Sequence, residues 1–144
     1  MQNSIDLYIE GAIRWAMQQI GSDKYATLCY EFLEDAYELG NGIILDGKGC
    51  TAREAADAYG WQPGNSPRGS YVFFDCSGPI RGEVRNWGHI GLSLGDGRII
   101  HAWDVVRVNT VREIEEFLPP PGWTTLVYLG WASAEQILQG MTTK

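Results

Sequence analysis

Three residues of this chain have the types and the order of a nucleophilic catalytic site, namely Cys29, His89 and His101. The two histidines are the only ones in the chain, and they fall in one short segment. A thiol attacks a carbonyl carbon when a neighbouring imidazole accepts its proton, and a further polar group orients that imidazole. A cysteine with two histidines therefore predicts the constellation of a cysteine hydrolase.

The histidine segment, residues 88–102, has the pattern of two alternating strands joined by a glycine-rich turn. A two-residue turn at Asp96-Gly97 would place the histidines on opposite faces of the sheet. A three-residue loop, Gly95-Asp96-Gly97, shifts the register by one and pairs His101 with Gly91. We predict the three-residue loop, which puts both histidines on one face as diagonal neighbours about 7 Å apart. Gly91 then leaves space above its strand for a substrate or a second side chain.

Cys29 stands in the first turn of a helix that we predict over about residues 27–39. Helix N-terminal amides stabilise a thiolate, so we expect a thiol pKa well below the ordinary value and a hydrogen bond to His89. A plain core position is the alternative, because Cys29, Phe32, Leu33 and Ala36 share helical spacing.

The other two cysteines fit catalysis less well. Cys76 follows an apolar run predicted as a strand over residues 70–75, and Pro79 prevents a helix from starting there. Cys50 lies in a glycine-rich loop. We assign neither a chemical role. An odd number of cysteines leaves at least one thiol free, and the cysteine and histidine spacing does not fit a structural zinc site.

Length, composition and charge limit the number of domains and the kinds of partner that this chain can have. A chain of 144 residues fits one domain, residues 1–144, with a full hydrophobic core. The net charge of −7 argues against nucleic acid and anionic lipid as partners. We find no segment with the length and hydropathy of a membrane span, no signal-peptide pattern at the N-terminus, and no nucleotide-binding loop. We therefore expect neither a cofactor nor a metal.

The elements that must position the candidate residues follow from periodicity and capping signals. We predict three helices first, over residues 4–20, about 27–39 and 52–60. Strands follow over residues 70–75, in the histidine segment, and over 104–108 and 126–131, with short helices after Thr110 and Ser133. Residues 76–88 are predicted to be irregular. Helices followed by antiparallel strands indicate an α+β fold with helices packed on a meandering sheet.

The histidine segment resembles the NlpC/P60-type papain-like cysteine peptidases of bacterial cell walls, a group related to the CHAP amidases. In that family a catalytic histidine opens one strand and a third polar residue, often histidine, follows about a dozen positions later. The strand at residues 69–74 and the helix around Cys29, which precedes His89 by 60 residues, are similar to family elements as well. The resemblance covers roughly residues 10–131.

The resemblance implies a role for each of the candidate residues. Cys29 would be the nucleophile, His89 the general base and acid, and His101 the group that orients His89. Tyr25 is similar in place to a family tyrosine near the oxyanion. The substrate cleft would then include Tyr25, Gly91 and the two tryptophans that flank the histidines, Trp87 and Trp103, although core packing fits both tryptophans equally well.

The resemblance implies cleavage of an amide bond in a peptidoglycan stem peptide, through a Cys-His-His triad and a thioester. Leu28-Cys29-Tyr30-Glu31 stands where the family usually has Asp-Cys-Ser-Gly. Two alternatives therefore stay open: a degenerate domain that binds a peptide or a protein partner, and a thioester-using acyltransferase. A bacterial or phage origin, action at the cell wall or in the periplasm, and an inhibitory or targeting partner fit the resemblance. A lysis module, an effector and a recycling enzyme all fit the resemblance.

Overall fold

Helices come first and strands follow in this structure, a computed structural model that describes residues 3–144. The helices are α1 (Ser4–Met17), α2 (Cys29–Asn41), α3 (Ala52–Tyr59), α4 (Val111–Glu115) and α5 (Ala134–Leu138). The strands are β1 (Ile43–Ile44), β2 (Tyr71–Asp75), β3 (Ser77–Ile80), β4 (Glu83–Asn86), β5 (His89–Ser93), β6 (Arg98–Ala102), β7 (Val106–Thr110), β8 (Val127–Ala132) and β9 (Thr142–Thr143). The predicted α+β class is confirmed.

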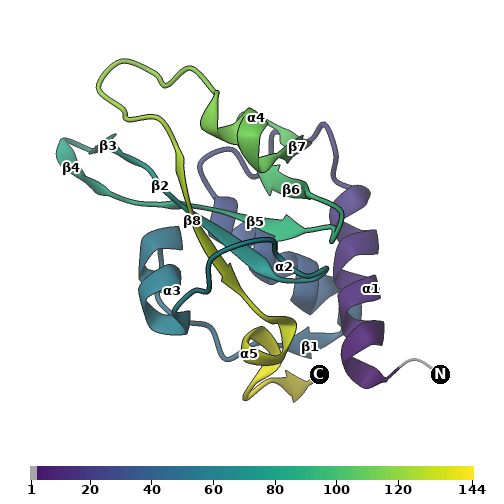
Figure 1. Ribbon diagram of the computed structural model, residues 1–144. Coiled ribbons are helices and arrows are strands. Elements are labelled where there is room, and N and C mark those ends of the chain that lie inside the picture. The colour runs from purple at the N-terminus through teal and green to yellow at the C-terminus, as the bar shows by residue number, and fades with distance from the viewer. Residues whose placement is uncertain (1–2) are drawn as a thin grey trace.

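The central sheet has five strands in the order β7-β6-β5-β2-β8, and every neighbouring pair is antiparallel (Figure 1). Strands β5, β6 and β7 form a meander, as predicted. Leu92 pairs with Ile100 and Ser93 with Ile99, which is the register of a three-residue loop. The prediction for the turn at Gly95-Asp96-Gly97 is therefore confirmed.

The sheet is covered on both faces. The larger core cluster joins α1, α2 and α3 to the face that carries Phe73, Ile90, Leu92 and Ile100. The smaller cluster lies on the opposite face, around Phe74, Ile99 and the α4 residue Ile114. Adjacent residues of one strand belong to different core clusters because strand side chains alternate between the two faces of the sheet.

The first two helices pack closely because each has a glycine at the point where they meet, Gly11 in α1 and Gly40 in α2. A Cβ atom on Gly40 would lie 2.4 Å from the carbonyl oxygen of Gly11. Helix α2, which begins at Cys29, is therefore held firmly against α1, with Phe32, Leu33, Ala36 and Tyr37 fully buried. Such packing fixes the position of the helix start relative to the sheet.

Three details of the predicted elements need correction. Helix α1 ends at Met17 and not at residue 20, because the next amides donate to carbonyls three residues back, as in Gln19 to Ala16. Residues 77–86 are not irregular but form the β3–β4 hairpin. The short pairing of β1 with β9 was not predicted.

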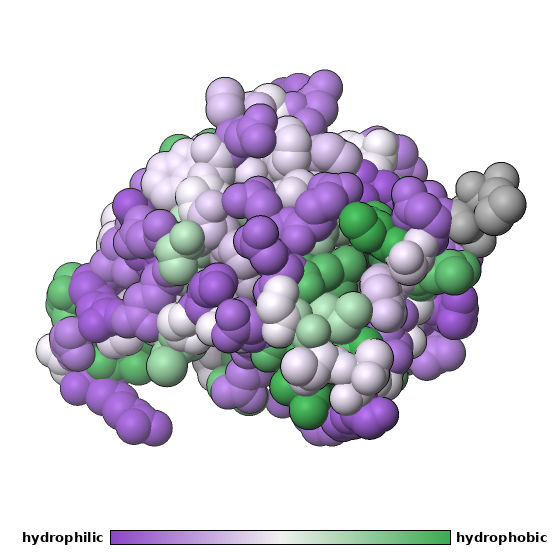
Figure 2. Space-filling model, turned by 90° about the horizontal axis from the view of Figure 1, so that it is seen from below, coloured by the Kyte–Doolittle hydropathy of each residue, from purple (hydrophilic) through white to green (hydrophobic). Residues whose placement is uncertain are grey.

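The surface is mixed in character. Seen from below, where β1 and α5 lie in Figure 1, a cluster of apolar side chains is bordered by polar ones (Figure 2). Within residues 3–144 no helix has both the length and the apolar character needed to cross a bilayer. No cluster of three or more potential metal ligands occurs in the same residues.

Candidate active site

Cys29 is the first residue of α2, as predicted. Leu28 at the N-cap provides no side-chain hydrogen bond, whereas α1, α3, α4 and α5 are each capped by a side chain. The first amides of α2 are therefore not covered by a capping group. The Cys29 side chain is half-buried, and its thiol is free.

His89 and His101 form a buried pair on one face of the sheet. The Nε2 atom of His89 lies 2.9 Å from the Nδ1 atom of His101. His89 is 3% exposed and His101 is fully buried. Burial lowers the pKa of His89 well below its usual value, and the neighbouring His101 lowers it further. Burial also lowers the pKa of His101, to about 4, so both rings are neutral near pH 7.

The sequence analysis missed a third member of this group, Asn109. Its Oδ1 atom lies 3.0 Å from the Nε2 atom of His101. Asn109 comes from β7, two residues after Arg107, which is the partner of His101 in the ladder. A signal was present in the sequence, because a meander places the polar residues of the next strand beside the histidine strand.

Aromatic rings hold the two imidazoles in place. The His89 ring meets Trp103 edge-on at a centroid distance of 5.1 Å, and the His101 ring stacks on Phe117 at 6.0 Å. Trp103 and Phe117 also contact each other. Both histidines therefore have little rotational freedom.

Cys29 and His89 both line one cavity of about 740 Å³. His101 lies behind His89 and does not reach the cavity lining. Three tryptophans and two prolines give the walls an apolar character: Trp87, Trp103, Trp123, Pro79 and Pro120. The predicted placement of Trp87 and Trp103 beside the histidines agrees with this lining.

Two residues expected in the cleft lie outside the cavity lining. Tyr25 is buried in the helical core, where its hydroxyl donates to Asp35 and its ring packs against Phe32. The space expected above Gly91 is filled by the neighbouring strand, since a Cβ atom there would lie 2.3 Å from Ile99 and 3.2 Å from His101. Gly91 thus accommodates His101 and not a substrate.

The expected lowering of the Cys29 pKa is wrong. Burial raises the pKa of the thiol to about 11, although backbone N–H groups of Ile90 and Tyr30 face the sulfur and favour the thiolate. The hydrogen bonds of residues 3–144 include none between the Cys29 thiol and the His89 ring. The resting site is therefore a neutral thiol near a neutral imidazole.

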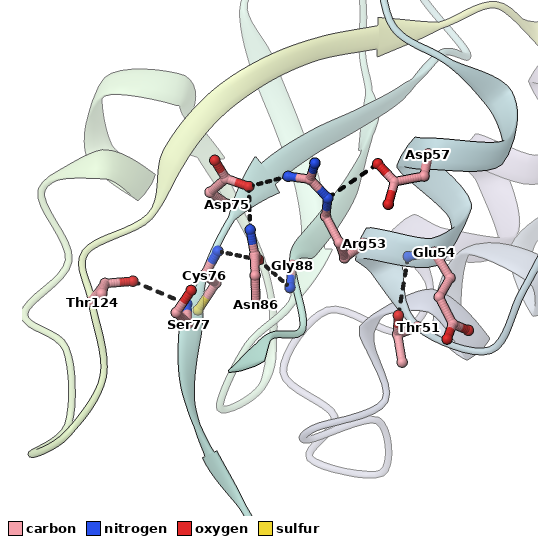
Figure 3. Close-up of polar contacts among 10 residues, drawn as sticks. All are labelled: Thr51, Arg53, Glu54, Asp57, Asp75, Cys76, Ser77, Asn86, Gly88 and Thr124. Atoms are coloured by element: carbon pink, nitrogen blue, oxygen red, sulfur yellow. Dashed lines mark hydrogen bonds and ion pairs between the residues drawn. The ribbon is translucent and has the colours of Figure 1, made fainter. Parts of the chain in front are cut away.

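A polar network holds the segment that leads into His89 (Figure 3). The side-chain oxygen of Asn86 accepts from the backbone N–H of Cys76 at 3.1 Å and from that of Gly88 at 3.0 Å. The Asn86 amide group donates to Asp75, which is also paired with Arg53 of α3. The network links α3, the end of β2 and the residue before His89.

Cys76 and Cys50 both border the same cavity. Cys76 is buried between β2 and β3, and burial raises its thiol pKa to about 11. Cys50 is exposed, and its backbone N–H donates to Glu54. Cys29 alone of the three cysteines begins a helix, which distinguishes it as the candidate nucleophile.

Known proteins match this chain through structure and not through sequence. No family model and no curated protein matches it. Among solved structures, RipD from Mycobacterium tuberculosis matches with a TM-score of 0.50 and 17% identity, over 88% of this chain and 98% of its own. The fold is that of an NlpC/P60 domain.

RipD is described as a non-catalytic NlpC/p60 domain protein with an adaptation to peptidoglycan-binding function. The NlpC/P60 fold therefore occurs in a protein that is described as non-catalytic. At 17% identity the likeness extends to the fold alone. The function of the present NlpC/P60 fold must be argued from its own side chains.

Proposed function

We propose that this chain is a cysteine hydrolase that cleaves an amide bond, with Cys29 as nucleophile, His89 as general base and acid, and His101 as the residue that orients His89. The observation that carries the proposal is the shared cavity, which holds the thiol at a helix start and an imidazole hydrogen-bonded at 2.9 Å to a second one. Nucleophile, base and orienting group are the three parts that this chemistry needs.

In the proposed reaction His89 takes the thiol proton while the Cys29 sulfur attacks the amide carbonyl carbon. Proton transfer accompanies attack because the thiol is neutral at rest, with a pKa of about 11. The start of α2 has no side-chain cap, and in the proposed reaction its backbone N–H groups donate to the developing oxyanion. Collapse breaks the C–N bond, and the protonated His89 gives its proton to the leaving amine. His89 then removes a proton from water, which hydrolyses the thioester and restores the thiol.

We propose a peptidoglycan stem peptide as the substrate. The fold likeness to a protein described as adapted to peptidoglycan-binding supports this choice. The cavity is also large enough for several residues of a peptide, at about 740 Å³. The negative net charge of the chain means that specific contacts in the cavity, and not general attraction to anionic polymers, would provide binding.

A second candidate is a domain that binds a peptidoglycan peptide without cleaving it. Two observations favour it: the raised pKa of the Cys29 thiol and the lack of a hydrogen bond from that thiol to His89 among the described residues. RipD is described as non-catalytic, which shows that this fold serves binding elsewhere.

The two candidates separate in one experiment with purified peptidoglycan sacculi. New amino groups and soluble fragments, measured by amine labelling and mass spectrometry, are expected for the hydrolase. Cys29→Ala and His89→Ala should each lower the rate on the order of 1,000-fold or more. Cys76→Ala is the matched control, since it removes the other buried cavity thiol and should leave cleavage largely intact. Products formed with an added amine acceptor in place of water would indicate acyl transfer.

Co-sedimentation with intact sacculi completes the comparison. Binding by the unmodified protein with no release of amines, and equal binding by Cys29→Ala, would support the second candidate and reject the first.

A further inference from the structure

Asn109, His101 and His89 form one continuous line of hydrogen bonds. The Oδ1 atom of Asn109 lies 3.0 Å from Nε2 of His101, and Nδ1 of His101 lies 2.9 Å from Nε2 of His89. His89 and His101 lie on neighbouring strands of the sheet, and Asn109 extends the line to a third strand. His89, at the far end of the line, is one of the residues that line the cavity, and its Nδ1 atom takes no part in the line.

The Asn109 amide presents its oxygen to His101, since Oδ1 lies 3.0 Å from the Nε2 atom of that ring. Asn109 directly precedes Thr110, the N-cap of α4, and the Thr110 backbone N–H donates to the Glu113 carboxylate at 2.8 Å in the capping box. The capping box therefore holds the backbone next to Asn109.

The position of every proton in the line follows from that orientation. An amide oxygen only accepts, so Nε2 of His101 carries a hydrogen. The ring is neutral, so its Nδ1 atom is a lone-pair acceptor and receives the hydrogen on Nε2 of His89. His89 is neutral as well, which leaves its Nδ1 atom without a proton.

We propose that Asn109 is a positioning residue that fixes the protonated nitrogen of both imidazoles and so keeps Nδ1 of His89 free to act as a base. The catalytic consequence rests on the proposed function, whereas the tautomers are a property of the folded chain. Reversal of the line would put hydrogens on Nδ1 of His101 and Nδ1 of His89. His89 would then have no free lone pair to accept the thiol proton, and the site would be inactive with all its residues present.

The tautomers can be measured without turnover, by two-bond proton–nitrogen NMR correlation on protein with 15N-labelled imidazoles. The chain has two histidines and both are in the line, so only two spin systems appear. Near pH 7 the expected spectrum shows a hydrogen on Nε2 and none on Nδ1 in both rings. A hydrogen on Nδ1 of either ring in the unmodified protein would overturn the proposal.

Two variants test whether Asn109 is the cause. Asn109→Leu removes the acceptor and should give mixed or reversed tautomers. Asn109→Asp has nearly the same shape, still accepts a hydrogen bond and should retain the Nε2–H form in His101. Unchanged tautomers in a folded Asn109→Leu protein would reject the role of Asn109. The unmodified protein remains an independent test if Asn109→Leu does not fold.

Activity measurements separate this inference from the proposed function. If the chain is a hydrolase, Asn109→Leu should lower kcat about 10-fold or more with little change in KM, and Asn109→Asp should restore most of it. If the chain only binds peptides, no variant has activity, but the tautomer spectra are unaffected by that outcome. Normal kcat in an Asn109→Leu protein with reversed tautomers would overturn the catalytic part alone.

Discussion

The backbone of Gly88 lies directly against the backbone of Arg53. A Cβ atom on residue 88 would come within 2.6 Å of the Arg53 nitrogen, which itself donates a hydrogen bond to the Trp87 carbonyl at 2.9 Å. Gly88 also has a φ of +73°, a left-handed conformation that side chains disfavour. The first turn of α3 thus shapes the segment that brings His89 to the cavity.

Gly88→Ala should therefore destabilise the protein and displace His89. We expect a loss of about 2–4 kcal/mol in unfolding free energy, from left-handed strain together with the clash against the Arg53 backbone. Urea unfolding of the variant and of the unmodified protein measures this loss in unfolding free energy. Gly82→Ala is the matched control, because Gly82 also has a positive φ, +80°, but no atom within 4 Å of its Cβ position. The control should lose only about 1 kcal/mol, and equal losses would show that the contact with Arg53 does not matter.

Alkylation of Cys29 by iodoacetamide should accelerate steadily from neutral to strongly alkaline pH. Only the thiolate reacts, and burial raises the pKa of this thiol to about 11. Peptide mapping over a pH series gives the rate for each cysteine, with the exposed Cys50 as an internal reference. A rate plateau in mildly acidic solution would instead show a thiolate–imidazolium pair, in contradiction to the neutral resting site.

Acid should destabilise the protein partly through His101. The pKa of this buried ring falls from 6.5 to about 4 on folding, so the unfolded chain takes up a proton below pH 6.5 that the folded chain refuses. Stability is thus complete above pH 6.5 and declines as pH falls to about 4, by about 3 kcal/mol for this group. The difference in unfolding free energy between the unmodified protein and His101→Gln should shrink over that range. If the unfolding free energies of the two proteins changed in parallel with pH, His101 would not contribute to acid destabilisation.

Glu34 should make the protein less stable as pH rises, which is the opposite pH dependence to that of His101. Burial, with the carboxylates of Glu38, Asp35 and Glu31, raises its pKa from 4.5 to about 7. Its contribution to stability is complete below pH 4.5 and is lost as pH rises through about 7. Glu34→Gln should therefore be more stable than the unmodified protein at pH 8 but not at pH 4, as measured by thermal unfolding. Glu31→Gln, an exposed change on the same helix, should show a smaller difference between the two pH values.

Sequence periodicity predicted most of the fold because the relevant signals are local. Thr110 with Glu113 and Ser133 with Gln136 form the capping boxes that begin α4 and α5. The β3–β4 hairpin escaped prediction because its turn consists of Arg81 and Gly82, both with positive φ, and arginine is an unusual residue at such a position.

The sequence predicted that the two histidines meet, but not the electrostatics of the candidate site. The register of β5 and β6 follows from the glycine loop, and that register brings His89 and His101 together. The pKa of Cys29 depends on how deeply packing buries the sulfur, which the helix position alone does not reveal. Asn109 was missed because its contact with His101 depends on the register of a third strand.

The capping box at Thr110 and Glu113 makes the state of the histidines dependent on local folding. A helix of five residues is not stable by itself in water, and α4 persists because Ile114 is fully buried in the smaller core cluster. If that turn opens, Asn109, the residue before the N-cap Thr110, is no longer held beside His101, and the proton arrangement on both imidazoles loses its anchor. Fraying of α4, a motion that hydrogen exchange detects, would thus change the base strength available in the cavity without moving any residue that lines it.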